Sequence, residues 1–368
     1  MYYIGLMSGT SMDAVDAALV KFDKKAILKL YNEYPLEISV KNQIRQINEK
    51  SNLIDVAILD NKLGYIFADA ANDLIKQANI NSNQVVAIGS HGQTILHVPT
   101  IKEKTSIQIS DPNIISAQTG ITTVADFRRM DMAYGGQGAP LTSSFHEYQF
   151  KGNNESIVIL NIGGFANVTL LPCDKDKIIG FDTGPGNALL DDWIRENKNV
   201  EYDKDGLWSN SGKADSELLK LLLKDNYFSL PIPKSTGREY FNLKWLKNNL
   251  DKLNKELPAE TTQATLLKLT AITITDAIMQ YAKGFTKVLV CGGGANNPLL
   301  MKNIQKLLGT FMEVTTTSDF ELPSDCVEAV AFAWLAKKRL ENKSVNISTV
   351  TGANKNAVLG GIYAPNKE

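Results

Sequence analysis

The chain has 368 residues, which fits two domains or one large one, and 43% of them are apolar, enough for a sizeable core. Its 39 lysines and arginines nearly balance its 40 aspartates and glutamates, which argues against a nucleic-acid-binding or membrane-surface protein. Because no run approaches the roughly 18 apolar residues of a membrane span and no signal-peptide pattern opens the sequence, we expect a cytoplasmic protein with neither nucleic-acid nor membrane partners.

The first part of the chain mixes strands and helices, as judged from the spacing of its apolar residues. Three short strands are expected first, over residues 2–7, 15–21 and 26–30. Two helices are expected next, over residues 39–49 and 53–78. Further strands are expected over residues 85–90, 106–110 and 121–127. Before the last of these, Asp111 and Pro112 form a typical helix start.

A glycine-rich segment, AYGGQGAP at residues 133–140, indicates a change of domain, and the pattern restarts after it. The run SIVILNIGGFANVTLLP reads as strand, glycine turn and strand, and KIIGFD reads as a third strand. Helices predominate from residue 186 to about residue 283. The run KVLVCGGGANNPLLMKNIQKLL then gives a strand, a glycine turn and a helix, and VEAVAFAWLAKKRL gives a last apolar helix.

Both parts of the chain therefore begin with an antiparallel meander of three strands and continue with helices and further strands, as expected for a duplicated fold. The prediction is an α/β protein of two related lobes with a ligand cleft between them. We assign residues 1–132 to the N-terminal lobe and residues 133–349 to the C-terminal lobe, and we expect residues 350–368 to complete the first lobe.

The stretch GLMSGTSMDAVDAALV places a tight turn of small and hydroxyl residues between the first two strands. Gly9, flanked by Ser8, Thr10 and Ser11, allows backbone N–H groups to approach an anion, and the hydroxyls add donors. We interpret this turn as a phosphate-binding hairpin, with a plain β-hairpin as the alternative. It is neither a Walker loop nor a dinucleotide-binding loop, because GxxxxGK[ST] is absent and no GxGxxG opens a helix after a first strand.

Two further glycine turns occur in the second part of the chain. Gly163 and Gly164 lie between two expected strands. Gly292, Gly293 and Gly294 lie between a strand and a helix, where a flat ligand can rest against the backbone and the helix start favours an anion. Three such turns at corresponding strand ends predict a nucleotide held from both lobes.

Cysteine and histidine are too sparse to predict a metal centre. The three cysteines are Cys173, Cys291 and Cys326, and none is part of a CxxC motif. The three histidines are His91, His97 and His146. We therefore expect no zinc site and interpret the cysteines as reduced thiols of a cytoplasmic protein.

The order of phosphate hairpin, second phosphate turn, CGGGA turn and final alanine-rich helix resembles the superfamily of acetate and sugar kinases, heat-shock chaperones and actin. Within it, the sequence is most similar to the anhydro-N-acetylmuramic acid kinases. The matching motifs follow one another over nearly the whole chain: GLMSGTSMDAVDAAL, GSHGQTILHVP, ADFRRMDMAYGGQGAPL, NIGGFANVTLL, GFDTGPGNALLDDW, YDKDG, PKSTGREYFNLKWL, CGGGANNP and EAVAFAWLA. The hairpin departs from the family at Ala14, where glycine is usual, but one methyl group is not expected to prevent ATP binding.

The resemblance implies a two-lobed, actin-like α/β fold and an ATP-dependent enzyme of cell-wall recycling. Such an enzyme opens the 1,6-anhydro ring of 1,6-anhydro-N-acetylmuramic acid and phosphorylates O6, giving N-acetylmuramic acid 6-phosphate. The implied partner is a small anhydrosugar, and the implied cofactors are ATP and Mg²⁺. The sequence leaves undecided whether the protein forms a homodimer.

Asp182, in GFDTGPGN, is the candidate base, because it follows an apolar strand and precedes a glycine–proline turn at what we expect to be the strand's end. The family's catalytic aspartate falls on this position. A helix cap is the alternative, although Thr183 or Asn187 can serve there. Glu328, at the start of the last helix, is implied to help hold the attacking water, with a favourable helix-dipole contact as the alternative.

The resemblance also carries over the nucleotide contacts. In the hairpin these are Gly9, Thr10, Ser11, Met12, Asp13, Ala14, Val15 and Asp16. In the other two turns they are the backbones of Gly163, Gly164, Gly292, Gly293 and Gly294. Either Asp13 or Asp16 is expected near Mg²⁺, which usually takes only one or two carboxylates beside phosphates and water.

Several polar residues are candidates for the sugar. After the VVAIGS strand, donors and acceptors are offered by His91, Gln93, Thr94 and His97, unless they form an ordinary exposed loop. Arg128 suits the lactyl carboxylate, because a guanidinium binds a carboxylate through two parallel hydrogen bonds. Arg129 is either an alternative for that role or a surface charge. Asp131 is expected to bind a sugar hydroxyl or to pair with Arg128.

Two other functions remain open from the sequence. A kinase of another anhydrosugar such as levoglucosan would have no anionic partner for Arg128, so the DFRRMD motif favours the muramyl sugar. A nucleotide-switched binding protein of the same superfamily would be expected to carry a partner-binding extension, which we do not predict after the last helix.

Overall fold

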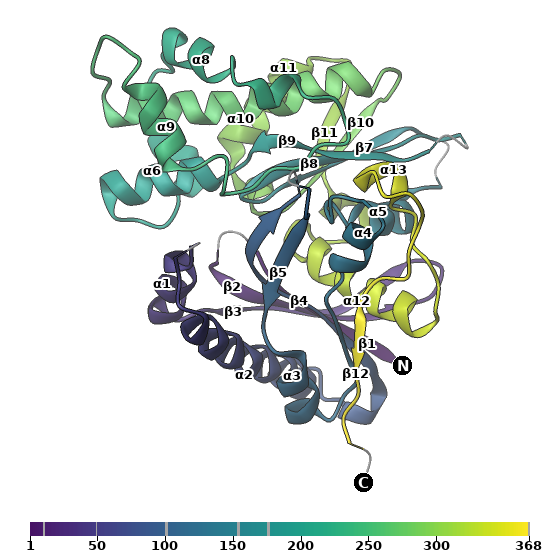
Figure 1. Cartoon of the computed structure of the whole chain (residues 1–368). Helices are drawn as coiled ribbons and strands as arrows, with labels where there is room; N and C mark the ends of the chain where they lie inside the picture. Colours follow the sequence, from purple (N-terminus) through teal and green to yellow (C-terminus); the bar gives the residue numbers. More distant parts are fainter. Residues whose placement is uncertain (10–11, 49, 100–101, 153–154, 175–176, 367–368) are drawn as a thin grey trace. The chain divides into compact units, whose positions relative to one another are not determined.

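The computed structural model describes residues 1–9, 12–48, 50–99, 102–152, 155–174 and 177–366, which form two compact units (Figure 1). The first unit comprises Met1–Gln149 and Cys326–Glu368, and the second comprises Phe150–Asp325. Each unit is built on its own β-sheet covered by helices. The predicted α/β class with two lobes is confirmed, whereas both lobe boundaries differ from the expected ones.

The sheet of the first unit starts with an antiparallel meander. Its strands are β1 (Tyr2–Ser8), β2 (Ala14–Phe22), β3 (Ala26–Pro35), β4 (Val85–Val98), β5 (Thr105–Ile109), β6 (Thr123–Ala125) and β12 (Gly361–Tyr363). Their order is β12-β6-β4-β1-β2-β3, with β5 paired to β4. β4 runs parallel to β1, and β6 runs parallel to β4. The C-terminal strand β12 pairs with β6, so residues 350–368 do belong to the first unit.

The sheet of the second unit repeats this plan. Its strands are β7 (Ile157–Ile162), β8 (Phe165–Leu171), β9 (Ile179–Pro185), β10 (Lys287–Cys291) and β11 (Glu313–Thr316). β7, β8 and β9 form the meander, β10 lies parallel to β7, and β11 lies parallel to β10. The order β11-β10-β7-β8-β9 therefore matches β6-β4-β1-β2-β3 strand for strand. This confirms the predicted duplication.

Helix α12 explains why the second unit ends before the residue that was expected. The helices of the first unit are α1 (Ile38–Gln46), α2 (Leu53–Gln77), α3 (Pro112–Thr119), α4 (Arg129–Ala133), α5 (Ser143–Phe150), α12 (Val327–Leu340) and α13 (Ser348–Thr351). A Cβ on Gly5 of β1 would lie 1.7 Å from the carbonyl oxygen of Ala329, and one on Gly89 of β4 would lie 2.1 Å from that of Phe332. α12 thus packs directly on the backbones of β1 and β4, and it belongs to the first unit.

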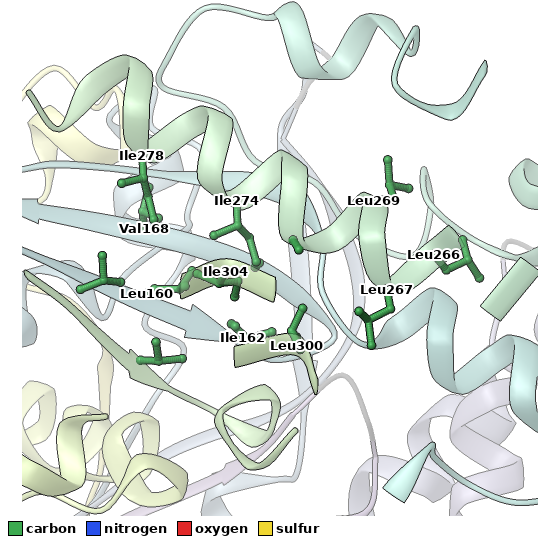
Figure 2. Packing of buried hydrophobic residues seen from close by; sticks show 14 of the residues in the cluster. Leu160, Ile162, Val168, Leu266, Leu267, Leu269, Ile274, Ile278, Leu300 and Ile304 are labelled. Atoms are coloured by element: carbon green, nitrogen blue, oxygen red, sulfur yellow. The ribbon is translucent and has the colours of Figure 1, made fainter. Parts of the chain in front are cut away.

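The core of the second unit lies between its sheet and two helices (Figure 2). The helices of this unit are α6 (Ala188–Lys198), α7 (Leu207–Ser211), α8 (Ser216–Leu222), α9 (Leu243–Leu250), α10 (Ala259–Tyr281) and α11 (Pro298–Leu308). Ile274 and Ile278 lie four residues apart on α10 and face the strands, because such residues share one side of a helix. Leu300 and Ile304 do the same on α11.

Two of the strands that are longer than predicted carry site residues. β4 continues to Val98 because its second half pairs with β5, so the polar residues expected just after the strand lie within it. β9 continues to Pro185 because its last residues still pair with the start of β8, so Asp182 lies within the strand rather than at its end. Among the described residues, no helix is long and apolar enough to cross a bilayer.

Candidate active site

The phosphate-binding hairpin predicted from the sequence connects β1 and β2. The backbone N–H of Met12 donates to the carbonyl of Gly9 at 3.1 Å, and Met12 adopts a φ of 60°. Thr10 and Ser11 lie outside the described residues. Val15 is fully buried in the core, so only its backbone can serve a ligand. The hairpin is therefore a tight turn anchored by its own hydrophobic side chains.

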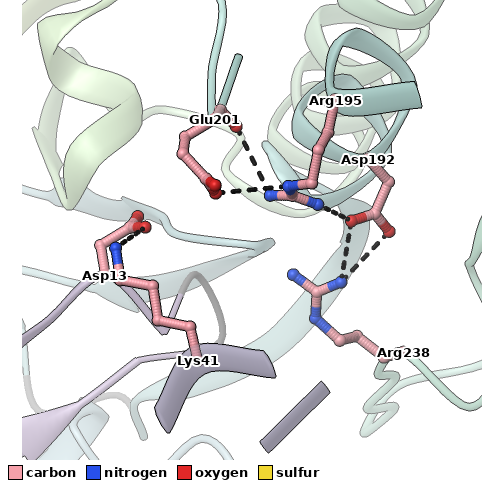
Figure 3. Close-up of polar contacts among 6 residues, drawn as sticks. All are labelled: Asp13, Lys41, Asp192, Arg195, Glu201 and Arg238. Atoms are coloured by element: carbon pink, nitrogen blue, oxygen red, sulfur yellow. Dashed lines mark hydrogen bonds and ion pairs between the residues drawn. The ribbon is translucent and has the colours of Figure 1, made fainter. Parts of the chain in front are cut away.

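The two aspartates of the hairpin differ in their surroundings. Asp13 has a half-exposed side chain, 3.5 Å from the Nζ atom of Lys41 on α1 (Figure 3). Asp16 is part-buried on β2, where the hydroxyl of Tyr31 donates to its Oδ1 atom at 3.0 Å. The same hydroxyl lies 3.0 Å from Glu33. Burial and these two carboxylates raise the pKa of Tyr31, which stays a neutral donor.

The second predicted glycine turn, Gly163 and Gly164, is hydrogen-bonded to the start of α6. The carbonyl of Gly163 accepts from the N–H of Asn187 at 2.9 Å, and that of Gly164 accepts from the N–H groups of Gly186 and Ala188 at 2.9 and 3.0 Å. The turn is thus fixed by α6, and its backbone geometry is set before any ligand binds.

In the third glycine turn, the first and last glycines pack against other residues, and the middle glycine faces open space. A Cβ on Gly292 would lie 2.4 Å from the Oδ1 atom of Asn161, and one on Gly294 would lie 2.3 Å from Ile162. A Cβ on Gly293 would meet nothing within 4 Å among the described residues. Packing against the end of β7 therefore requires the outer two glycines, and Gly293 leaves room for a ligand. The Oδ1 atom of Asn161 is buried and has no hydrogen-bond partner among the described residues.

Asp182 is a nearly buried carboxylate, 7% exposed, on β9. Its Oδ2 atom accepts from the backbone N–H of Thr236 at 2.9 Å. Its own N–H donates to the carbonyl of Lys234 at 2.9 Å, and its carbonyl accepts from the hydroxyl of Tyr227 at 2.9 Å. The backbone on both sides of Asp182 and its carboxylate are thus held by one segment, residues 227–236.

Sequence reasoning did not assign a role to this segment, although PKSTG lies in one of the motifs that carry the family resemblance. Lys234 is buried, and its Nζ atom donates to the carbonyls of Tyr227 and Phe228, each at 3.1 Å. Burial lowers the pKa of Lys234, and the charge of Asp182 opposes that shift. The signal available in the sequence was a lysine followed directly by two hydroxyl residues, Ser235 and Thr236.

A charge network ties the same segment to α6. Nη1 of Arg238 lies 3.1 Å from Oδ2 of Asp192, and Nη1 of Arg195 lies 2.9 Å from Oδ1 (Figure 3). Glu201 accepts from Nε of Arg195 at 3.3 Å. Arg238 follows Thr236 by two residues, so this network helps to fix the loop whose amide holds Asp182.

Four predicted sugar residues lie on β4, within the first unit. His91 and Gln93 are buried, and the Oε1 atom of Gln93 accepts from the hydroxyl of Ser8 at 2.8 Å. Thr94 accepts from the side chain of Gln108 on β5 at 3.3 Å. His97 lies 3.0 Å from the hydroxyl of Ser106, and its Nε2 atom is buried without a hydrogen-bond partner among the described residues. The strand therefore presents an ordered polar row.

Arg128 is held by a neutral histidine. Its Nε and Nη2 atoms lie 3.1 and 2.9 Å from Nε2 of His91, and its Nη1 atom donates to the carbonyl of Gly138 at 2.7 Å. Nδ1 of His91 lies 3.0 Å from the carbonyl of Gly92, which assigns the proton to Nδ1 and leaves Nε2 as the acceptor. Burial and the charge of Arg128 lower the pKa of His91 well below its usual value. His91 thus positions the guanidinium without cancelling its charge.

Asp131 has a different role from the one expected. It is fully buried, its Oδ2 atom accepts from the N–H of Gly138 at 2.7 Å, and its Oδ1 atom accepts from the hydroxyl of Thr351 at 2.7 Å. Burial raises its pKa. A Cβ on Gly136 would lie 2.2 Å from Oδ2. Asp131 therefore fastens the glycine-rich segment to the C-terminal segment instead of facing a sugar.

The remaining candidates are placed as follows. Arg129 is exposed and pairs with Asp126 at 2.7 Å, as the surface-charge alternative requires. Glu328 lies in the first turn of α12, in the first unit. Asp182, Gly163, Gly164 and the Gly292–Gly294 turn lie in the second unit.

The buried histidines predict an acid-sensitive fold. His91 and His146 are both buried, and burial lowers the pKa of His146 to about 3. Both bind a proton in the unfolded chain below a pH of about 6.5 but stay neutral when folded. The free energy of unfolding should be undiminished above that pH and fall below it, by up to about 1.4 kcal/mol per pH unit for each histidine.

Urea unfolding at pH 7.5 and pH 5.0 measures this loss. The variant His146→Gln should lose less stability between the two pH values than the wild type, because one titrating group is gone. An equal loss in both proteins would contradict the assignment of a neutral His146.

The sequence matches one family of known proteins over nearly its whole length. The family model described as anhydro-N-acetylmuramic acid kinase matches residues 1–365. A protein of that name from Coxiella burnetii (strain Dugway 5J108-111) is 49% identical over 364 residues, covering 98% of this chain and 97% of its own. Another from Aliivibrio fischeri is 47% identical over 368 residues, covering 99% of each. Among solved structures, the activator of the 2-hydroxyisocaproyl-CoA dehydratase from Clostridium difficile with bound ADPNP is 10% identical, covers 93% of this chain and 96% of its own, and gives a TM-score of 0.47.

Proposed function

The chain belongs to the anhydro-N-acetylmuramic acid kinase family and is a kinase, and from this premise we propose how its residues carry out the reaction. Water adds to the anomeric carbon of 1,6-anhydro-N-acetylmuramic acid, the bond from that carbon to O6 breaks, and O6 takes the γ-phosphoryl group of ATP. The product is N-acetylmuramic acid 6-phosphate, and the reaction belongs to peptidoglycan recycling in the cytoplasm.

Asp182 is the general base toward the water. The observation that carries this role is its nearly buried carboxylate, fixed at Oδ2 by the amide of Thr236. A base must be held within hydrogen-bond reach of the proton it removes, and such positioning contributes much of the rate of phosphoryl transfer. Because the departing oxygen becomes the phosphoryl acceptor, one carboxylate serves both events. Glu328 helps to hold the water.

The glycine turns fit a nucleotide. Gly293 leaves open space for a ligand, and the neighbouring Gly292 lies against a buried oxygen of Asn161 that has no partner among the described residues. The hairpin at Gly9 fits phosphate groups. ATP supplies the phosphoryl group, and Mg²⁺ would neutralise part of its charge. The described residues contain no cluster of three or more metal-binding side chains, which fits an ion held mainly by phosphates and water. Asp13, half-exposed on the hairpin, fits the single carboxylate better than the part-buried Asp16.

Arg128 binds the lactyl carboxylate, and the polar row of β4 binds the sugar's hydroxyl and amide groups. His91 holds Arg128 in place, and Gln93, Thr94 and His97 offer the remaining donors and acceptors. A ring rich in hydroxyl groups needs several such partners, which a strand facing its ligand can supply in fixed register.

Turnover in ¹⁸O-labelled water tests this function. With ATP and 1,6-anhydro-N-acetylmuramic acid, the label should appear at C1 of the sugar phosphate and not in the phosphoryl group. Without ATP, ring opening should be slow, because O6 would leave with no acceptor for its developing charge. Label in the phosphate, or fast hydrolysis without ATP, would contradict the coupled mechanism, and turnover of levoglucosan alone would contradict the substrate.

A further inference from the structure

The first unit contains a cavity of about 310 Å³ between α4, the last turn of α12 and residues 344–360. Its polar lining is contributed by Tyr134, Arg339, Ser344, Lys355 and Asn356. None of the described residues that line it is an aspartate or a glutamate. None of them has been assigned to the nucleotide or the sugar either, so the proposed function leaves this cavity without a role.

Arg339 brings a positive charge to the cavity without a counter-charge. Its Nε atom donates to the carbonyl of Gly360 at 2.8 Å, which fixes the guanidinium. Its two Nη atoms have no hydrogen-bond partner in the described part of the chain. Glu341 follows Arg339 by two residues but pairs with Lys337 and Lys343 instead. The outer edge of the Arg339 fork is therefore free to bind an anion.

Lys355 brings a second positive charge. Its Nζ atom lies 4.3 Å from the centre of the Tyr134 ring, and it forms no ion pair with a carboxylate among the described residues. The ring holds the ammonium group in place but does not neutralise it. The Oδ1 atom of Asn356 accepts from the N–H groups of Ile347 and Ser348 at 3.2 and 3.1 Å, so its Nδ2 atom stays available as a donor.

We propose that this cavity binds a small phosphate monoester. Such a group carries a charge of about −1.5 to −2 at pH 7 and matches the two cations, whereas a carboxylate would neutralise only one. The guanidinium of Arg339 binds phosphate oxygens through parallel N–H groups, and Lys355 acts as a point charge. The hydroxyl of Ser344 and the amide of Asn356 add neutral donors.

The remaining wall of the cavity indicates an organic phosphate instead of the free ion. Its volume is at the lower end of the range for small-molecule pockets and exceeds what one phosphate group fills. Apolar surface for the organic part is supplied by Met130, Ala357 and Val358. This binding site goes beyond the proposed function and does not rest on it.

Calorimetry of the full chain with glucose 6-phosphate tests this site, with Mg²⁺ and an uncleavable ATP analogue present to occupy the nucleotide site. The wild type should bind glucose 6-phosphate, bind glucuronate at least about tenfold more weakly, and not bind glucose. Arg339→Gln and Lys355→Gln should each weaken binding of glucose 6-phosphate by about tenfold or more. Lys338→Gln is the matched control and should stay within about twofold of the wild type, because Lys338 lies over the Trp334 ring and does not line the cavity.

Thermal unfolding provides a second readout. Arg339→Gln also loses the hydrogen bond to Gly360, but Lys355→Gln removes only an exposed contact and should melt close to the wild type. Glucose 6-phosphate should raise the melting temperature of the wild type and of Lys338→Gln more than that of Lys355→Gln.

Three results would overturn the inference. They are no binding of glucose 6-phosphate by the wild type, unchanged affinity in Lys355→Gln, and glucuronate binding as tight as that of glucose 6-phosphate. Because binding is measured without turnover, these results leave the proposed function untouched. Conversely, a protein that fails to phosphorylate the anhydrosugar would overturn the proposed function and leave this site in place.

Discussion

Replacing Asp182 with asparagine should lower kcat by about 100-fold or more, while the anhydrosugar binds almost as well as before. Asparagine has the same shape, and its oxygen can still accept from the N–H of Thr236, as Oδ2 of Asp182 does at 2.9 Å. The variant therefore keeps the loop and loses only the ability to take a proton. Stopped assays of sugar phosphate formation give kcat, and calorimetry with the anhydrosugar gives the affinity.

Asp276 provides the matched control for that experiment. It is an exposed aspartate on α10, so Asp276→Asn makes the same chemical change away from the site. Its kcat should stay close to that of the wild type. A nearly normal rate in Asp182→Asn would remove Asp182 from the base role, and a loss of sugar binding equal to the loss of rate would assign it to binding instead.

The spacing of apolar residues was sufficient to predict the repeated meander and the helices, because this spacing differs between strands and helices and can be read from neighbouring residues. α12 was predicted over the residues that it occupies, 327–340. Its place in the fold was not, since the contacts of Gly5 with Ala329 and of Gly89 with Phe332 join segments more than 200 residues apart. The second unit therefore ends at Asp325 instead of the expected residue 349.

The polar row of β4 shows a second limit. The strand was predicted to end at Ser90, because the residues that follow it, including His91, Gln93 and His97, are largely polar. β5 pairs with it and satisfies its backbone, so the strand continues. Pairing with a strand further along the chain cannot be seen in a local window.

The sequence indicated single residues as candidates for the chemistry, but it did not show which other residues hold them in place. Asp182 and Arg128 were singled out by their residue type and place. Their holders, Thr236 for the first and His91 for the second, lie 54 and 37 residues away in sequence. The sequence also did not show that Asp131 is fully buried and accepts hydrogen bonds from Gly138 and Thr351.

Replacing Arg128 with leucine should weaken binding of the muramyl sugar by about 2–3 kcal/mol, or roughly 30- to 150-fold in Kd. The reason is the loss of a charged, oriented donor for the lactyl carboxylate. His91 is neutral and packs against Phe332 with ring centroids 4.5 Å apart and the ring planes tilted by 35°, so it holds the guanidinium in one orientation without neutralising it. Calorimetry with 1,6-anhydro-N-acetylmuramic acid measures the loss.

Two comparisons make this result specific to the carboxylate. A 1,6-anhydro sugar that carries the N-acetyl group but no lactyl group should bind wild type and Arg128→Leu almost equally. Arg129→Leu removes the neighbouring charge, which pairs with Asp126 on the surface, and should leave the affinity for the muramyl sugar nearly unchanged. Equal losses on both sugars in Arg128→Leu would instead assign Arg128 to the packing of β4 and the glycine-rich segment through His91 and Gly138. The substrate's carboxylate would then need another partner, and the preference for the muramyl sugar would not depend on the DFRRMD motif.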